Sequence, residues 1–293
     1  MRPVALDCAS DPLTSALAAK GRNGAAGGAE ARVLARGAGW SVFDIVCTCG
    51  PRDQPFEEQR ATSSISLVLA GTFVSRGARG SALLAAGSLF LVNADEPFEC
   101  SHQHGEGDRC LSFHFEPELF ERLAHDAGAS SAPFRNHSLP PLRTHSQLIA
   151  RARAAMAQPE AFEEIALELA GAAVGSFASG PDRSTPARHH AQIARVLRGL
   201  GERFTEPHSI AAMADTAGMS PFHFLRSFKR ATGVTPHQWL MRARLRDAAQ
   251  RLGTTAARIT DVALDAGFDD LSNFNRNFRA EFGVSPRAWR AAA

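Results

Sequence analysis

Short runs that are either apolar throughout or alternate between apolar and polar residues fill the region from Trp40 to Pro117. Gly, Pro and Asn separate these runs, and turns are expected at Gly71, Gly77, Gly80 and Gly87. A period of two places successive side chains on opposite faces of a strand, so the pattern predicts an antiparallel β-sandwich or β-barrel. The expected strands are 40–49, 64–76, 88–94, 98–104 and 109–117.

The pattern changes on both sides of this region. Residues 1–36 are rich in Ala and Gly, and we expect them to form a loosely ordered lead-in. After Pro117 the apolar residues recur with a helical period, and helices are expected over 117–128 and 159–178. The second helix has an apolar stripe that fits either a core face or a dimer seam, and it consists of Phe162, Ile165, Leu169 and Phe177.

The C-terminal third contains an internal repeat. Residues 214–239 align with residues 263–289 when one residue is inserted in the second copy, and both copies carry Gly-Val-Thr/Ser-Pro before a Trp. Capping residues at helix starts and Gly at helix ends make each copy a predicted helix-turn-helix. These boundary residues are Ser209, Gly218, Ser220 and Pro221 in the first copy, and Thr260, Gly267 and Asp269 or Asp270 in the second.

The second helix of each copy has an apolar inner face and a polar outer face. Phe224 and Phe228 lie four residues apart and should pack inward together, as should Phe274 and Phe278. Arg and Asn can bond guanine and adenine edges, and Lys suits phosphates, so the outer faces predict contact with DNA. The outer residues are Phe222, His223, Leu225, Arg226, Lys229 and Arg230, and then Leu271, Ser272, Asn273, Asn275, Arg276 and Arg279.

The segment 235–252 between the two copies is helical in pattern. At about 1.5 Å per residue, a continuous helix of that length would separate the two outer faces by tens of ångströms. This is near the roughly 34 Å of one DNA turn, so one chain could enter two successive major grooves.

The charge distribution supports a polyanionic partner for the C-terminal third alone. From residue 187 onward there are 16 Lys and Arg against 9 Asp and Glu, whereas residues 1–186 carry 16 against 21. No apolar run is long enough for a membrane span, so we expect no membrane partner. The N-terminus lacks the apolar core of a signal peptide, and five Cys without framework spacing favour reduced thiols in the cytoplasm.

Residues 188–291 resemble the DNA-binding domain of AraC/XylS-type transcription regulators, on the pattern "ITDVALDAGFDDLSNFNRNFRAEFGVSPRAWR" at 259–290. The strand–turn–strand texture of 66–93 is similar to the cupin-type sensor domain that many such regulators carry. The resemblance implies an α+β chain, with a cupin-like antiparallel β-barrel and helical extension followed by an all-α domain with two helix-turn-helix units. The expected limits are 1–36 for the lead-in, 37–178 for the effector and dimerisation domain, 179–187 for the linker and 188–293 for the DNA-binding domain.

The same resemblance implies that helices 220–231 and 270–281 enter the DNA groove. Leu225 departs from the family, in which a polar residue is common there, and it contacts a thymine methyl group or nothing. The implied partners are a double-stranded promoter site, an unidentified small effector, a second copy in a homodimer, and RNA polymerase as a further candidate. The implied base-facing residues are Phe222, Leu225 and Arg226, and Leu271, Ser272, Asn275 and Arg276.

The stretch 98–115 also places Cys and His on shared strand faces. Cys100, His102 and His104 alternate along one expected strand, Cys110 lies on the next, and "HGEGD" can form the turn between them. These ligand types suit zinc or another divalent metal, the one candidate cofactor. Alternatively, the cysteines are buried small residues, or a redox sensor that also includes Cys47 and Cys49.

Two other functions are compatible with the sequence. A cupin-like metal enzyme with a helical accessory domain is disfavoured, because "PFEEQRATSS" lacks the early His-x-His and Phe98 stands where a later His is usual. No other catalytic motif stands out, so we expect no enzyme. An architectural protein that binds DNA without sequence preference is the second alternative.

Overall fold

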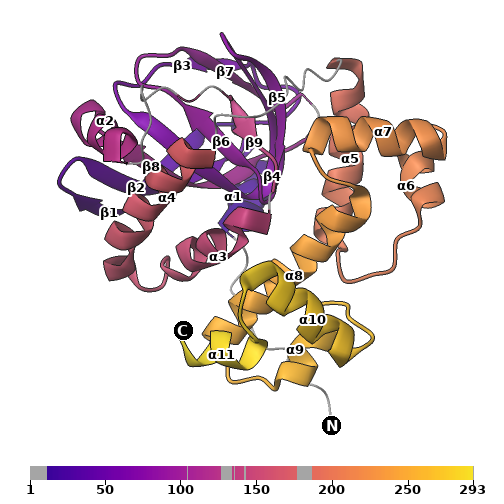
Figure 1. The fold of residues 1–293 in the computed structure, drawn as a ribbon. Helices are drawn as coiled ribbons and strands as arrows, with labels where there is room; N and C mark the ends of the chain where they lie inside the picture. Colours follow the sequence, from indigo (N-terminus) through magenta and orange to yellow (C-terminus); the bar gives the residue numbers. More distant parts are fainter. Residues whose placement is uncertain are drawn as a thin grey trace.

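The computed structural model describes residues 12–103, 105–126, 134, 136–141, 143–176 and 187–292, and these form two parts (Figure 1). Strands and a few helices make up the N-terminal part, whereas the C-terminal part contains helices alone. The α+β class expected from the sequence is therefore confirmed. Within the described residues, no helix is long and apolar enough to cross a membrane.

Antiparallel pairing joins all the strands of the N-terminal part, as the alternating pattern predicts. They are β1 (Ala29–Gly37), β2 (Trp40–Cys47), β3 (Phe56–Glu58), β4 (Ser63–Gly77), β5 (Gly80–Ala85), β6 (Leu89–Val92), β7 (Phe98–Ser101), β8 (Asp108–Phe115) and β9 (Ser138–Leu139). The first half of β4 pairs with β6 and β8, and its second half pairs with β5 and β7. One long strand therefore belongs to both faces of the barrel-like domain.

Gly71 allows β4 to change partners at its middle. Its φ is +76°, and a Cβ atom there would lie 2.2 Å from the Gly107 carbonyl oxygen. Only glycine fits such a backbone conformation and such a close approach. A register shift between Val68 and Ala70 accompanies the bend.

The lead-in expected over residues 1–36 is wrong for the described part of that range. Helix α1 spans Pro12–Asn23, and β1 pairs with β2 from Ala29 opposite Cys47 to Gly37 opposite Trp40. Most side chains of β1 are exposed, because it is an edge strand with β2 as its neighbour. It therefore lacks the apolar alternation by which the inner strands were predicted.

The remaining helices of the N-terminal part are α2 (Pro117–Asp126), α3 (Ser146–Ala154) and α4 (Phe162–Ser176), with 3-10 turns at Arg143–His145 and Pro159–Ala161. They cover one face of the sheet and close the main apolar core. The stripe on α4 belongs to this core, since Phe162, Ile165 and Leu169 are all buried, and the rings of Phe162 and Phe113 lie 5.9 Å apart. The core interpretation is confirmed for these three residues, while Phe177 lies outside the described residues.

The C-terminal part consists of α5 (Ala187–Glu202), α6 (Ile210–Ala217), α7 (Pro221–Thr232), α8 (Pro236–Thr254), α9 (Ile259–Asp265), α10 (Leu271–Phe282) and α11 (Pro286–Ala291). The long helix α8 joins a first group, α5 to α7, to a second group, α9 to α11 (Figure 1). Each group has its own apolar cluster, and α8 contributes Trp239 to the first and Leu245 to the second. The linking helix predicted from the sequence is therefore continuous.

The two parts of the chain are packed against each other. Val74 of β4 and Leu83 of β5 lie in the same buried cluster as Ile193 and Leu197 of α5. At the other end of α8, Ala150 of α3 is buried among residues of α8, α9 and α10. Both helix groups therefore have an apolar contact with the β domain.

Candidate DNA-contacting surface and interdomain pocket

Local hydrogen bonds build the first helix-turn-helix from α6 and α7. Ser209 Oγ accepts a hydrogen bond from the Ala212 amide at 3.1 Å, and Gly218, at φ +63°, ends α6. Ser220 Oγ accepts from the His223 amide at 3.4 Å, and Pro221 begins α7. All four boundary residues predicted for this copy are confirmed.

The second copy begins differently from the prediction. Helix α9 starts at Ile259, its N-cap is Arg258, and no side chain caps it, so the expected cap at Thr260 is wrong. Thr260 lies inside the first turn, where its Oγ1 is 3.3 Å from Asp261 Oδ1. Gly267, at φ +88°, follows α9 as predicted and forms the turn.

Asp270 rather than Asp269 caps α10. Its two carboxylate oxygens accept from the amides of Ser272 at 2.9 Å and Asn273 at 3.0 Å. The Asn273 side-chain oxygen in turn accepts from Arg276 at 3.0 Å and from Asn277 at 2.7 Å. The start of α10 is therefore a hydrogen-bonded unit that fixes the direction of Arg276.

The outer faces of α7 and α10 are mostly exposed to solvent, whereas the paired phenylalanines on their inner faces are buried. Phe224, Phe228, Phe274 and Phe278 are fully buried, as predicted. Phe222 is 71% exposed, with the Arg226 guanidinium 5.7 Å from its ring centre. Asn273 is half-buried, and the other predicted contact residues are exposed, namely Phe222, His223, Leu225, Arg226, Lys229, Arg230, Leu271, Ser272, Asn275, Arg276 and Arg279.

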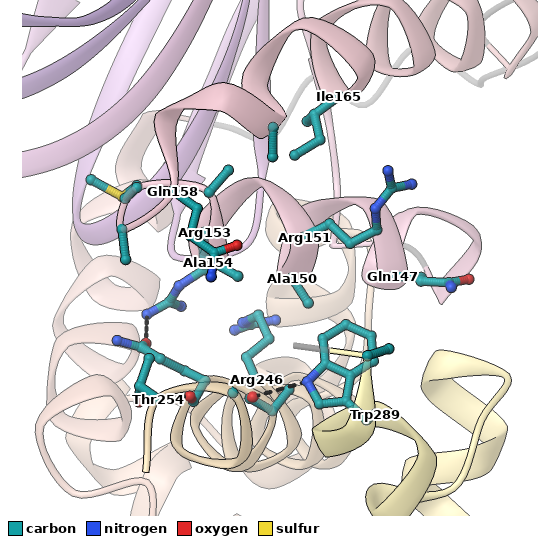
Figure 2. Close-up of a pocket in the computed structure, with 18 of the residues that line it drawn as sticks. Gln147, Ala150, Arg151, Arg153, Ala154, Gln158, Ile165, Arg246, Thr254 and Trp289 are labelled. Atoms are coloured by element: carbon teal, nitrogen blue, oxygen red, sulfur yellow. Dashed lines mark hydrogen bonds between the residues drawn. The ribbon is translucent and has the colours of Figure 1, made fainter.

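A cavity of about 620 Å³ lies between the two parts of the chain (Figure 2). Ala150 and Gln147 of α3 and Ile165 of α4 line one side, and Arg246 of α8 and Trp289 of α11 line the other. Figure 2 shows Arg246 and Trp289 facing the α3 side of this cavity. Because its walls come from both parts, a bound molecule would contact both.

Arg246 is a buried arginine of the pocket that has no ion-pair partner among the described residues. Burial, and then the nearby Arg153 cation, lower the pKa of Arg246 to about 9. Among the described residues its guanidinium makes one hydrogen bond, to the Ala86 carbonyl at 3.4 Å, and no ion pair. The Glu281 carboxylate raises the pKa of Arg246 without forming an ion pair with it, so an anionic group in the pocket would supply a closer counter-charge.

The structure does not gather the predicted metal ligands Cys100, His102 and Cys110 into one set. Cys100 and Cys110 lie in an apolar cluster with Phe73 and Phe90, and burial raises the pKa of both thiols. A buried thiol that stays protonated is a poor nucleophile, which disfavours a redox role for these two cysteines. The fourth predicted ligand, His104, lies outside the described residues.

A different set comes together at the end of β2. The ligand atoms of Cys47, Cys49 and His102 all lie within 4.8 Å of one another, and all three side chains are buried. Cys47 and Cys49 were predicted to share a strand face, but their approach to His102 was not. The pairing of β2 with β8, and of β7 with β4, brings these distant residues together.

Two family models match the chain. The one described as "AraC-like ligand binding domain" matches residues 49–174, and the one described as "Helix-turn-helix domain" matches residues 213–292. Together they account for more than half of the sequence, in the order that the two structural parts follow. The chain belongs to the AraC family.

Among AraC-family relatives, the chain is similar to the "HTH-type transcriptional activator RhaS" of Enterobacter sp. (strain 638), at 36% identity over 34% of this chain and 36% of that protein. It is 37% identical to the protein of the same name from Escherichia coli O157:H7, over 31% of this chain and 33% of that protein. The chain thus matches about a third of the length of these curated relatives. The crystal structure of the DNA-binding domain of AdpA in complex with a target DNA matches with a TM-score of 0.33, at 34% identity, over 34% of this chain and 91% of that one.

Two residues that organise the AraC-type helices were not identified from the sequence. Arg244 of α8 donates to the carbonyls of Phe204 at 2.7 Å and Gly267 at 2.7 Å, and so joins the two helix groups. Glu281 of α10 lies 3.3 Å from Arg242 of α8 and accepts a hydrogen bond from Ser146 of α3. A polar residue on a helix reveals its partner only through the fold, so no local signal pointed to either role.

Proposed function

We propose that the chain is a transcription regulator that binds a specific site in double-stranded DNA through α7 and α10. One observation carries the proposal: two separately capped helices present exposed polar faces in the part of the chain with excess positive charge. A helix of this kind fits the major groove, with its first residues at the base edges. Because α8 joins both units, they can occupy neighbouring grooves of one duplex.

Distinct roles follow from the chemistry of the exposed side chains. Arg276, oriented by Asn273, can donate two hydrogen bonds to a guanine, and Asn275 can pair with an adenine edge. Lys229 lies in the last turn of α7 and suits a backbone phosphate. Phe222 and Leu225 offer apolar surface of the kind that contacts a thymine methyl group.

Selection of bound sequences from a random duplex pool tests sequence specificity directly. The full chain should enrich one motif, and in gel-shift competition an excess of the motif should displace the probe where the scrambled sequence does not. Equal competition by both duplexes would contradict the proposal. That result would favour the architectural alternative, in which backbone contacts alone hold the DNA.

We further propose that a small effector binds in the interdomain pocket. Arg246 favours a ligand with an anionic group, and Ile165, Met156 and Trp289 favour an apolar body. Such a ligand would bind best to one arrangement of the two parts, and so would shift the population of arrangements that bind DNA. The proposed first domain keeps its limit at 178 but begins with α1 and β1 instead of at residue 37. The proposed linker ends at 186, because α5 of the DNA-binding domain begins at Ala187.

A thermal-shift panel of aliphatic and aromatic carboxylates tests this pocket. A carboxylate that raises the melting temperature of the full chain should lose its effect in Arg246→Gln and keep it in Arg122→Gln, a control on the exposed side of α2. An equal shift in both variants would place the ligand elsewhere. No shift from any carboxylate would remove the anionic ligand from the proposal.

We also propose that the chain forms a homodimer through its N-terminal part. RNA polymerase is the proposed protein partner, and the cytoplasm is the proposed location. The family and the printed names of its relatives, which are transcriptional activators rather than enzymes, support these proposals. Analytical ultracentrifugation of the full chain tests the dimer. A monomer at micromolar concentration with and without promoter DNA would contradict it.

A further inference from the structure

Cys47, Cys49 and His102 form a compact set at one end of the β domain. Cys47 is the last residue of β2, Cys49 follows two residues later, and His102 follows directly after β7. One ligand atom from each lies within 4.8 Å of the other two, and each residue is less than a tenth exposed. Two sulfurs and one imidazole at this spacing are the donor types that zinc prefers.

The hydrogen bonding of His102 leaves one ring nitrogen available. Its Nε2 lies 2.6 Å from Asp108 Oδ2, and because an ionised carboxylate only accepts hydrogen bonds, Nε2–H is the donor. Its Nδ1 is buried and has no hydrogen-bond partner among the described residues. With the proton on Nε2, Nδ1 holds a lone pair that nothing in this part of the protein satisfies.

An unsatisfied buried nitrogen is costly, and a metal ion would remove the cost. Metal-binding histidines usually donate the second ring proton to a carboxylate, which fixes the tautomer and the ring orientation. Asp108 occupies that position, and Cys110 Sγ donates to its other oxygen at 3.2 Å, which holds the carboxylate in place. The cluster therefore contains both the ligands and the supporting group of a metal site.

We propose that Cys47, Cys49 and His102 bind one zinc ion. Both cysteines bind as thiolates, so two thiol protons pass to solvent. His102 binds through Nδ1, while its Nε2–H keeps its hydrogen bond to Asp108. Three protein ligands leave one position of a tetrahedral ion for water or for an exogenous donor. This site differs from the set predicted around Cys100 and Cys110, which the fold places in apolar surroundings.

The surrounding contacts connect this site to the N-terminal helix. Lys20 of α1 donates to the Thr48 carbonyl at 2.7 Å, and Thr48 lies between the two cysteines. The Gly107 amide donates to the Cys49 carbonyl at 2.8 Å. Zinc would therefore fix the loop on which α1 is held, and we expect it to raise the thermal midpoint of the N-terminal part.

Metal analysis of the full chain, purified from zinc-supplemented medium, tests the proposal. We expect one zinc per chain in the wild-type protein and in Cys100→Ala, and loss of zinc in Cys49→Ala and His102→Gln. Cys100→Ala is the matched control, because it removes an equally buried thiol from the same domain. Wild-type protein without zinc, or full zinc content in Cys49→Ala, would overturn the assignment.

Cobalt substitution of the wild-type protein gives a second measurement that needs no variant. Tetrahedral Co²⁺ with two thiolates should show strong visible absorption and a thiolate-to-metal band in the near ultraviolet, both removed by added zinc. Absence of the thiolate band would overturn the proposal even if zinc is present. A Cys47–Cys49 disulfide in protein purified without oxidant would also overturn it. DNA binding is measured separately, so failure here leaves the proposed function untouched.

Discussion

At the scale of single residues, the hydrogen bonds of the backbone explain which sequence predictions hold. Ser209, Ser220 and Asp270 were identified because a capping side chain acts on amides only two or three residues away. The cap predicted at Thr260 is wrong because α9 starts two residues earlier than that cap implies, after Arg258, and no side chain caps it. Contacts between distant residues, such as His102 with the two cysteines, depend on strand pairing and have no local signal.

Arg276→Ala should remove the preference for one base. Loss of a paired contact to a guanine edge costs about 1–3 kcal/mol of binding free energy, and the selected motif should become degenerate at that position. Lys229→Ala is the comparison: it should weaken all duplexes alike and reduce the salt slope of log K by about one. Gel-shift titrations at several salt concentrations separate the two. A uniform loss in Arg276→Ala would assign that residue to the backbone.

His137 should make the fold less stable as the pH falls. Burial, and then the Arg79 cation, lower the pKa of His137 from 6.5 to about 4, so only the unfolded chain binds the proton between these values. The free energy of unfolding should fall below pH 6.5 by up to about 1.4 kcal/mol per pH unit from this group. Urea titrations between pH 7 and 5 should show a smaller slope in His137→Gln, and an unchanged slope would contradict this.

At the scale of elements, exposure decided what the pattern could predict. The inner strands β2, β4, β6, β7 and β8 have buried faces and were all predicted from short apolar or alternating runs. Strand β1 and helix α1 bury little, and β9 is two residues long, so none of them has a readable period. The helix-turn-helix units were the most predictable elements because each boundary carries its own capping or glycine signal.

Gly267 should tolerate substitution worse than Gly218 does. Both residues have positive φ. A Cβ atom added at Gly267 would lie 2.6 Å from the Thr205 carbonyl oxygen, whereas a Cβ atom added at Gly218 would have no heavy atom within 4 Å. Gly218→Ala should therefore cost about 1 kcal/mol from the left-handed backbone alone, and Gly267→Ala clearly more. Chemical denaturation of both variants checks this, and equal losses would show that the turn can relax.

At the scale of the whole molecule, α8 and α10 connect the proposed DNA-contacting surface to the β domain. Glu281 of α10 is nearly buried, and it contacts Arg242 on α8 and Ser146 on α3. The pocket lies beside these contacts, because its walls include Gln147, next to Ser146, and Arg246, one turn after Arg242. We therefore expect a ligand in the pocket to change the position of α10. This arrangement could not be foreseen from the two sequence patterns, because neither pattern carries information about the other.

Glu281→Ala should loosen this connection. Removal of a charged hydrogen-bond partner costs about 2 kcal/mol, and amides of α3 and α10 should exchange faster with solvent deuterium. Glu160→Ala, an exposed glutamate before α4, is the control and should change stability by less than about 0.5 kcal/mol. Unchanged exchange in α10 would show that other contacts hold the two parts together.

Both helix-turn-helix units are proposed to bind one face of the same duplex, and methylation interference on the selected site, with the full chain, tests this. We expect two zones of major-groove contact whose centres lie about 10–10.5 base pairs apart. Arg226→Ala should alter the first zone and Arg276→Ala the second. A single zone of contact, or a pattern that neither variant changes, would contradict it.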